Sequence, residues 1–186
     1  MHLRSFTLLA IALLLRCTNS NQSKSSLATE YYQAFDESDF KRISEVIADT
    51  IVVAEGEYVT RYSSDSFYTQ FKWDSTFNTR YQITDLKEDG DNVFLTVSSS
   101  SIRYNFLRNN PLICEFKVSF KNQKISRIDV LGCPNADWGV WQAERDSLVS
   151  WTSIHHPELD GFINDLTMAG ALNYLKAIEY YQSNEN

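Results

Sequence analysis

The spacing of apolar residues changes twice along this chain, and these changes limit the fold more than any single motif does. Leu27, Tyr31 and Phe35 lie at fourfold spacing, which is typical of one face of a helix. Between residues 81 and 131 apolar residues mostly alternate with polar ones, as in strands with one buried face. Helical spacing returns beyond residue 137. Helices, then strands, then helices again predict an α+β fold.

Local signals place the individual elements. Ser25 or Ser26 can cap the first helix, and Asp36–Asp39 breaks it. Asp89–Asn92, with the sequence Asp-Gly-Asp-Asn, predicts a tight hairpin turn. The other predicted elements are a second helix at 40–47, a hairpin of strands at 51–54 and 58–62, a third helix carrying Phe67 and Phe71, a last hairpin of strands at 112–120 and 125–131, and helices at 138–154 and 169–182.

A run of serines, Ser98–Ser101, separates two apolar patterns of opposite phase. Val93, Leu95 and Val97 define one face at odd positions, whereas the apolar residues of 102–106 occupy even positions. A β-bulge produces such a phase slip within a strand. The sequence therefore predicts one long curved strand that bends at the serines and continues to Phe106.

The N-terminus has the composition of an export signal. The run from Phe6 to Leu15 follows Arg4 and is shorter than the roughly 20 residues that span a bilayer, but it suits the apolar core of a secretory signal. Cys17 and the polar segment 18–26 come next, which resembles the acylated cysteine and tether of a bacterial lipoprotein. We therefore expect a lipid anchor at Cys17 and a location in the cell envelope, facing the periplasm. Arg16 stands where a small residue normally precedes the lipidated cysteine, so plain secretion stays an alternative.

The charge balance argues against one class of partner. The chain has 17 basic and 24 acidic residues, a net charge of −7, and loss of Arg4 and Arg16 with the leader would bring it to about −9. A surface of this sign repels phosphate backbones, so we do not expect nucleic acid as a partner. The rest of the chain is long enough for one ordinary domain.

Two cysteines, Cys114 and Cys133, remain if Cys17 carries lipid. In an exported protein such a pair favours a disulfide. Strand alternation points the other way, because Cys114 would share a face with Phe116 whereas Cys133 would lie on the opposite face of the hairpin. A bulge at Gly132 would reverse that relation. A disulfide and two separately buried thiols both stay open.

Three segments near the start of the mature chain carry a family resemblance. They are Ala28–Phe35 (ATEYYQAF), Ser38–Phe40 (SDF) and Val46–Val53 (VIADTIVV). With the order of elements, they resemble the nuclear transport factor 2-like superfamily, including its SnoaL-like branch. The resemblance covers roughly residues 26–133 and implies a cone, in which a curved antiparallel sheet wraps around the N-terminal helices.

The resemblance also implies a division of the chain. We expect a signal peptide at 1–16, a lipidated cysteine and tether at 17–26, a cone domain at 27–134 and a C-terminal helical extension at 135–186. Trp138, Trp141 and Trp151 would pack the extension onto the cone.

Aromatic residues would surround a pocket inside such a cone. The expected pocket residues are Tyr31, Phe35, Tyr58, Tyr62, Phe67, Phe71, Trp73 and Tyr104. Aromatic walls with a few polar groups suit flat apolar ligands. The leading prediction is therefore non-catalytic binding of a small apolar or aromatic ligand. One alternative is a cone filled by its own side chains, acting as an interaction module or forming a homodimer through the outer face of the sheet.

Enzymes of the superfamily imply another alternative, a lyase or isomerase. They place an acidic base near the end of the first strand, where this chain has Glu55. Tyr31 or Tyr32 would supply a phenol, and Glu115 would be the second acid. The set assembles poorly, because Glu55 precedes a glycine in a turn, so we favour a protein that is not an enzyme.

No pattern predicts a metal or a cofactor. His155 and His156 are adjacent, and neighbouring side chains on a helix point apart, so they form a poor chelate. A histidine at a helix C-terminus more often interacts with the helix dipole. No Cys/His spacing suits zinc, and no glycine-rich loop suits phosphate.

Overall fold

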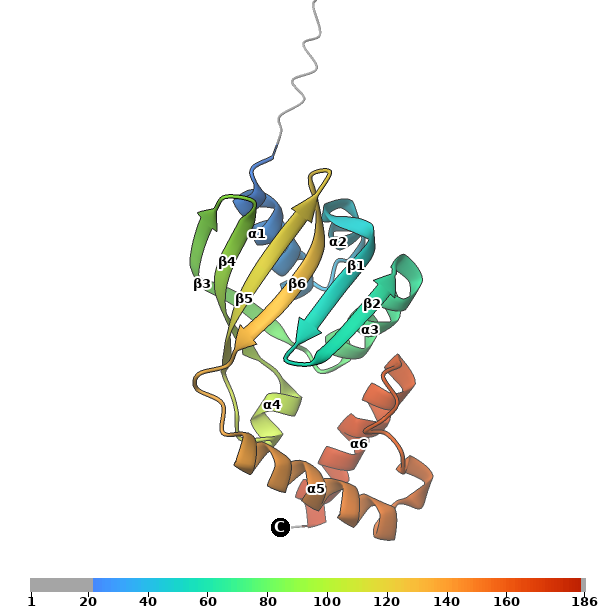
Figure 1. The fold of residues 1–186 in the computed structure, drawn as a ribbon. Coiled ribbons are helices and arrows are strands. Elements are labelled where there is room, and N and C mark those ends of the chain that lie inside the picture. Colours follow the sequence, from blue (N-terminus) through green and yellow to red (C-terminus); the bar gives the residue numbers. More distant parts are fainter. Residues whose placement is uncertain (1–21, 185–186) are drawn as a thin grey trace, which may run out of the picture.

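The computed structural model describes residues 22–184, in which a curved six-stranded sheet carries helices on one face (Figure 1). The expected signal peptide and the expected lipidation site, Cys17, lie outside the described residues. The strands are β1 (Ile47–Glu55), β2 (Tyr58–Ser63), β3 (Arg80–Asp89), β4 (Asn92–Ser100), β5 (Leu112–Lys121) and β6 (Lys124–Gly132). They lie in the order β2-β1-β6-β5-β4-β3. Neighbours are antiparallel except β1 and β6, which are parallel, so the sheet is mixed rather than wholly antiparallel.

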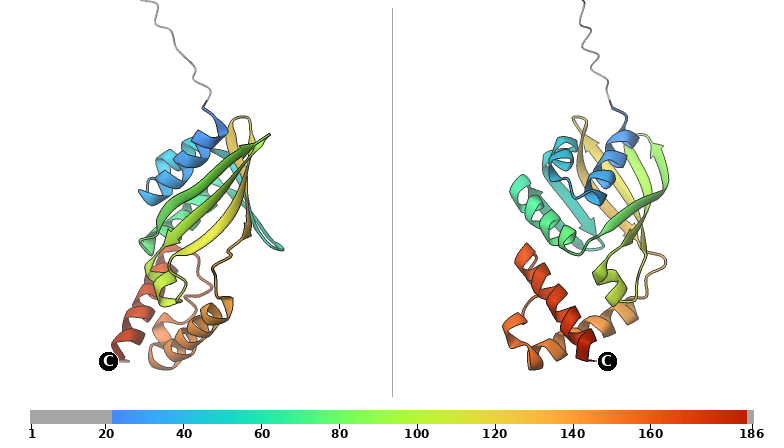
Figure 2. Two further views of the ribbon diagram at one scale, coloured as in Figure 1. Left: turned by 90° about the vertical axis from the view of Figure 1, so that its left-hand side faces the viewer. Right: turned by 180° about the vertical axis from the view of Figure 1, so that it is seen from behind.

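The first and third helices, α1 (Lys24–Asp36) and α3 (Ser64–Thr76), lie on the same face of the sheet (Figure 2). A short helix, α2 (Phe40–Val46), follows α1. The helix α1 buries Leu27, Tyr31 and Phe35 together, as their spacing predicts. Its cap is Ser23, two or three residues before the predicted serines. Ser25 instead binds the Glu88 carboxylate of β3 through both its backbone and its hydroxyl.

The predicted strand after the serines is wrong, because residues 102–106 form a short helix, α4 (Ile102–Phe106). The hydroxyl of Ser101 accepts a hydrogen bond from the Tyr104 amide at 3.0 Å and so caps this helix. A serine that satisfies a free amide favours a helix start over a continued strand. The phase change therefore marks the end of β4, and Ile102 and Phe106 are one helical turn apart.

The C-terminal segment lies beyond one end of the sheet (Figure 1). It consists of α5 (Trp138–His155), a 3₁₀ turn (Pro157–Leu159) and α6 (Met168–Asn184). It shares a second core with the ends of α3 and α4, built by Trp73, Phe77, Phe106, Leu107, Leu148, Leu159, Phe162, Ala171, Tyr174, Ala177 and Ile178. Trp141 packs against Tyr104 of α4, whereas Trp151 packs against Tyr181 of α6.

None of the helices within residues 22–184 has both the length and the apolar character needed to span a bilayer.

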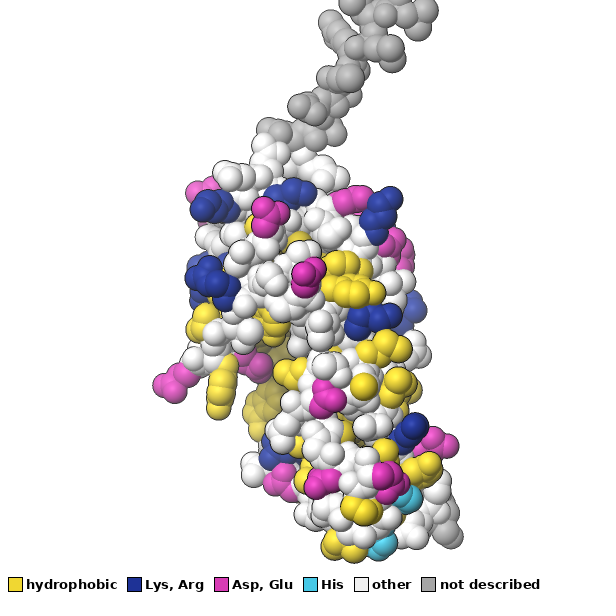
Figure 3. Space-filling view, turned by 90° about the vertical axis from the view of Figure 1, so that its right-hand side faces the viewer, with side chains coloured by type: hydrophobic (Ala, Val, Ile, Leu, Met, Phe, Trp, Pro, Cys, Tyr) yellow, Lys and Arg dark blue, Asp and Glu magenta, His cyan; other side chains and the backbone are white. Residues whose placement is uncertain are grey.

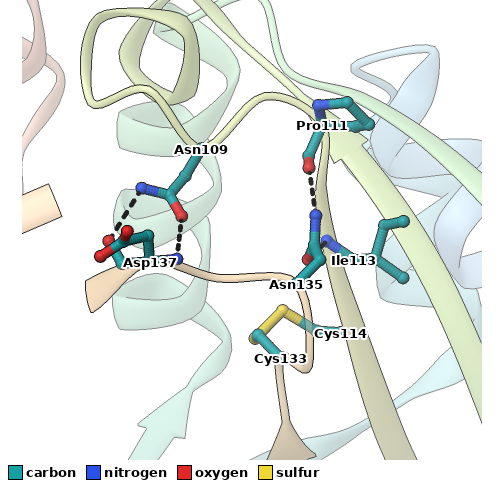
Figure 4. Close-up of a disulfide and its surroundings, with 7 residues drawn as sticks. All are labelled: Asn109, Pro111, Ile113, Cys114, Cys133, Asn135 and Asp137. Carbon is teal, nitrogen blue, oxygen red and sulfur yellow. Dashed lines mark hydrogen bonds between the residues drawn. A yellow bond between two sulfur atoms is a disulfide. The ribbon is translucent and has the colours of Figure 1, made fainter. Parts of the chain in front are cut away.

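Cys114 and Cys133 form a disulfide (Figure 4). The pairing of β5 with β6 shifts by one residue there, since Glu115 lies opposite Gly132 but Phe116 lies opposite Val130. Leu131 is therefore the extra residue of a bulge. This shift reverses the face of Cys133, and the two Cα atoms are 4.0 Å apart. The argument from strand alternation against a disulfide is therefore wrong, because it assumes a regular pairing of the strands.

Two asparagine side chains hold the same region (Figure 4). The Asn135 amide donates to the Pro111 carbonyl, and its oxygen accepts from the Ile113 amide, both at 2.8 Å. Asn109 makes the same double contact with the backbone of Asp137. These bonds continue the pairing where the strands end, and they set the start of α5 against the lower end of the sheet.

Candidate ligand-binding cavity

A cavity of about 180 Å³ lies between α1 and the inner face of the sheet. Aromatic and aliphatic side chains from α1, α4 and five strands form most of its wall. Its lining residues are Tyr31, Tyr32, Phe35, Val53, Tyr81, Ser99, Tyr104, Leu112, Cys114, Phe116, Ile128 and Val130.

The expected pocket residues divide into three groups. Tyr31, Phe35 and Tyr104 line the cavity. Phe67 and Phe71 are fully packed in the adjoining core, where Tyr62 is half-buried against Phe67. The other two lie elsewhere: Trp73 belongs to the second core under the C-terminal helices, and Tyr58 is 83% exposed at the start of β2.

The expected catalytic set does not come together. Tyr31 and Tyr32 both line the cavity, but Glu55 is exposed at the end of β1. Glu115 is exposed as well, because its neighbours Cys114 and Phe116 are the residues of β5 that face the cavity. The two glutamates therefore lie outside the cavity wall.

A different acid stands beside the cavity tyrosines. The Tyr81 hydroxyl of β3 donates to the carboxylate of Asp74 at 2.6 Å, and Asp74 lies in the last turns of α3. The helix pattern contains a usable signal, because Asp74 follows the buried Phe67 and Phe71 by seven and three positions. An acidic residue in line with a buried apolar stripe needs a partner, and Tyr81 provides it.

Burial dominates the electrostatics of this pair. Desolvation raises the pKa of Asp74 above 3.8, although the hydrogen bond from Tyr81 and the charge of Arg103 oppose the shift. Desolvation, then the charge of Asp74, raise the pKa of Tyr81 well above its usual value. Burial likewise raises the pKa of Tyr31 and of Tyr32. These phenols stay protonated at neutral pH, so Tyr81 is the donor in its bond to Asp74.

Other polar groups of the wall are free to meet a ligand. Within residues 22–184, the Tyr31 hydroxyl makes no side-chain hydrogen bond to another residue, and neither does the Ser99 hydroxyl. Both side chains line the cavity, so they add two groups that can donate or accept. The cavity is thus mainly apolar, with a few hydroxyls fixed by buried aromatic rings.

Arg103 holds the lower edge of the cavity against the C-terminal helices. Its guanidinium lies over the ring of Trp73 at 4.6 Å and over that of Tyr104 at 5.0 Å. The rings of Phe77 and Trp141 lie at 5.3 and 5.5 Å. Such cation–π contacts are each worth about 0.5–2 kcal/mol. They join α3, α4 and α5 around one charge.

The described residues contain no group of three or more metal-ligating side chains. Nδ1 of His155 donates to the Trp151 carbonyl one turn earlier, and His156 pairs with Glu158, so the two rings have separate hydrogen-bond partners.

Comparison with known proteins places the fold. No family model matches the sequence, and no curated protein matches it. Among solved structures, IdmH from Streptomyces antibioticus, named a putative polyketide cyclase, matches with a TM-score of 0.51 and 15% identity over 67% of this chain and 99% of that chain. A protein from Kribbella flavida matches with a TM-score of 0.53 and 13% identity, over 66% of this chain and 93% of that chain.

A third neighbour identifies the architecture. It is an uncharacterized cystatin-fold protein from Novosphingobium aromaticivorans, with a TM-score of 0.50 and 16% identity over 60% of this chain and 99% of that chain. Matches at such low identity show a shared fold and leave activity open. Together with the sheet and helix arrangement, they show that this chain has a cystatin-like α+β fold, the type of fold that the resemblance to the nuclear transport factor 2-like superfamily implies.

Proposed function

We propose that the cone cavity binds a small aromatic or apolar molecule that carries one hydrogen-bond donor, and that the protein does not convert it. The observation that carries the proposal is an apolar wall around Tyr81, whose hydroxyl is committed to Asp74. Because the Tyr81 hydroxyl donates its hydrogen bond to Asp74, its oxygen keeps a lone pair that can accept a hydrogen bond from a ligand.

The size of the cavity narrows the ligand class. Its volume is about 180 Å³, whereas sites for drug-sized ligands occupy about 300–1,000 Å³. An apolar cavity of about 150 Å³ holds benzene. A single substituted ring, such as a phenol, therefore suits this cavity. The name of the neighbour IdmH raises polyketide cyclisation as a reaction class, but a multi-ring substrate exceeds this volume.

Phenol and toluene form a matched pair of test ligands. Each should raise the melting temperature, by about 5–10 °C when its concentration is near 100 times its Kd. Phenol should bind more tightly, because only phenol can donate to Tyr81. Tyr81→Phe should remove that advantage and leave toluene binding unchanged, as measured by thermal denaturation across a ligand titration.

Val130→Phe is the control for the location of binding. Val130 lines the cavity, and the larger ring would occupy the space that a ligand needs. Neither compound should then shift the melting temperature. The proposal fails if neither compound stabilises the wild-type protein, or if Val130→Phe binds both as well as wild type does.

A second candidate function is a lyase or isomerase, and the specific observation in its favour is Asp74. A desolvated carboxylate with a raised pKa beside a phenol is a common acid–base arrangement. Such an enzyme would exchange the α-protons of a small cyclic ketone such as cyclohexenone, measured by deuterium incorporation in NMR spectra. Exchange should disappear in Asp74→Asn and persist in Glu55→Gln. Exchange no faster than in buffer would reject this candidate.

The location in the cell envelope is part of the proposal. Its support is the export-type N-terminus and the Cys114–Cys133 disulfide, since disulfides persist in oxidising compartments. The anchoring residue, Cys17, lies outside the described residues.

A further inference from the structure

A second recess lies outside the cone, between the turn of the β1–β2 hairpin and the first turns of α5. Its volume is about 580 Å³, and its lining residues are Glu55, Gly56, Glu57, Tyr58, Trp138, Trp141, Gln142 and Arg145. Figure 3 shows a hollow with hydrophobic side chains on its floor beside the protruding hairpin. We call this recess the outer groove.

The outer groove is separate from the cone cavity. Tyr104 lines the cavity, Trp141 lines the groove, and their rings pack against each other with centroids 5.8 Å apart. The two rings therefore form a shared wall. A ligand of the groove would not occupy the site proposed above.

Aromatic rings in the groove are unusually open to solvent. Tyr58 is 83% exposed and Trp138 is 48% exposed, and Trp138 meets the half-buried Trp141 edge to face at 5.4 Å. The two-residue turn between Glu55 and Tyr58 places the tyrosine at the start of β2, where it lines the groove together with Trp138 of α5. Large rings held open in this way provide stacking surface at little cost in conformational entropy.

Most polar side chains of the groove are available to a ligand. Within residues 22–184, Glu55, Glu57 and Gln142 make no side-chain hydrogen bond or ion pair. Arg145 pairs with Asp146, which leaves further N–H donors on its guanidinium. The groove thus offers carboxylate acceptors, an amide and guanidinium donors around aromatic rings.

This mixture selects one ligand class. A wholly apolar ligand would desolvate two unpaired carboxylates, which is costly. An anion would meet the unpaired carboxylates of Glu55 and Glu57, and an organic cation would meet the guanidinium of Arg145, so a neutral ligand avoids both repulsions. A pyranose ring has an apolar C–H face that stacks on an aromatic ring and hydroxyls at its edge that both donate and accept. We propose that the outer groove binds a carbohydrate.

The test uses three disaccharides as probes: maltose, cellobiose and N,N′-diacetylchitobiose. Each is titrated to about 10 mM, a range that reaches a Kd near 1 mM, with tryptophan fluorescence and calorimetry as readouts. At least one should bind saturably to wild type. Tyr58→Ala and Trp138→Ala should each weaken that binding by about tenfold, and Glu57→Gln should weaken it less.

Two control variants locate the binding. Tyr68→Ala removes a ring that is 45% exposed but lies outside the groove, and Val130→Phe fills the cone cavity. Both should bind the disaccharide as wild type does. Because Tyr58 is so exposed, its alanine variant should fold normally, which circular dichroism checks. Absence of saturable binding by all three sugars, or binding unchanged in both Tyr58→Ala and Trp138→Ala, overturns the proposal.

Discussion

The charge of Asp74 depends on the tertiary structure. In an unfolded chain its carboxyl would be solvated, but in the folded protein it lies under the aromatic wall of the cone and bonds to Tyr81. Its raised pKa means that the folded state holds this proton more tightly than the unfolded state does. The stabilising contribution is complete below the unfolded pKa of 3.8 and is lost as the pH rises through the folded pKa.

Replacing Asp74 with asparagine should therefore change how stability depends on pH. Asp74→Asn cannot ionise, so its free energy of unfolding should rise relative to wild type between about pH 3 and pH 7. Urea denaturation at several pH values measures this difference. A difference that stays constant or falls over this range would contradict a buried, destabilising charge.

Asp91→Asn is the matched control for that experiment. Lys24 bonds to the Asp91 carboxylate at 2.7 Å and lowers its pKa, so the stabilising contribution of Asp91 is present at higher pH and is lost on acidification. This variant should thus show the opposite sign. The effect should be small, because the Asp91 side chain is exposed and solvent screens the pair.

At the scale of elements, the junction of the β5–β6 hairpin with α5 determines how the lower end of the sheet is held. The disulfide and the two asparagine contacts act on the same few residues (Figure 4). Cys114 also lines the cavity, so this junction is part of the candidate site. The bulge that makes the disulfide possible comes from a shift in strand pairing.

The disulfide should contribute measurable stability. A cross-link over a separation of 19 residues is worth about 3 kcal/mol. The double variant Cys114→Ser/Cys133→Ser should therefore unfold about 6–12 °C lower, as followed by calorimetry. It should keep its fold, because Asn135 still holds β5 and Asn109 still holds the residue before α5.

A reducing agent provides the control for that prediction. It should lower the melting temperature of wild type to about that of the double variant, and it should leave the double variant unchanged. If the reductant has no effect on wild type, the two cysteines are not paired in the folded protein.

For the whole molecule, the cone, the appended helices and the N-terminus have different roles. The cone surrounds the cavity, and the C-terminal helices pack under α3 and α4 through the second core. The proposed anchor would leave α1 close to the membrane surface, since Cys17 precedes it by only a few residues.

Lipid attachment at Cys17 gives the prediction at this scale. Expressed in a bacterium with its full leader, wild type should fractionate with membranes and show the mass of a diacylglyceryl-modified cysteine. Cys17→Ala should lose that mass and appear in the soluble fraction. Cys114→Ser/Cys133→Ser is the control, because it should still be lipidated. An unmodified Cys17 in membrane-free wild type would favour plain secretion.

The repeat patterns of the sequence by themselves determine the elements and the fold class. Fourfold spacing in α1 and alternation in β4 record which faces are buried, because local backbone geometry sets those periods. A local signal can still be misassigned, as Ser101 shows, since a serine can mark a bend or cap a helix. The cavity residues Tyr31 and Phe35 could be predicted from the sequence because they belong to the helical pattern of α1, whereas the pattern around Tyr104 was misassigned to a strand.

The tertiary structure alone decided the contacts between distant segments. The partnership of Asp74 with Tyr81 depends on how α3 lies against β3, and the pairing of Cys114 with Cys133 depends on a one-residue shift between strands. The outer groove needs the β1–β2 turn and α5 to meet, although they are about 80 residues apart in the chain. Sequence periodicity reports which side of an element is buried, but it carries no record of which other element covers that side.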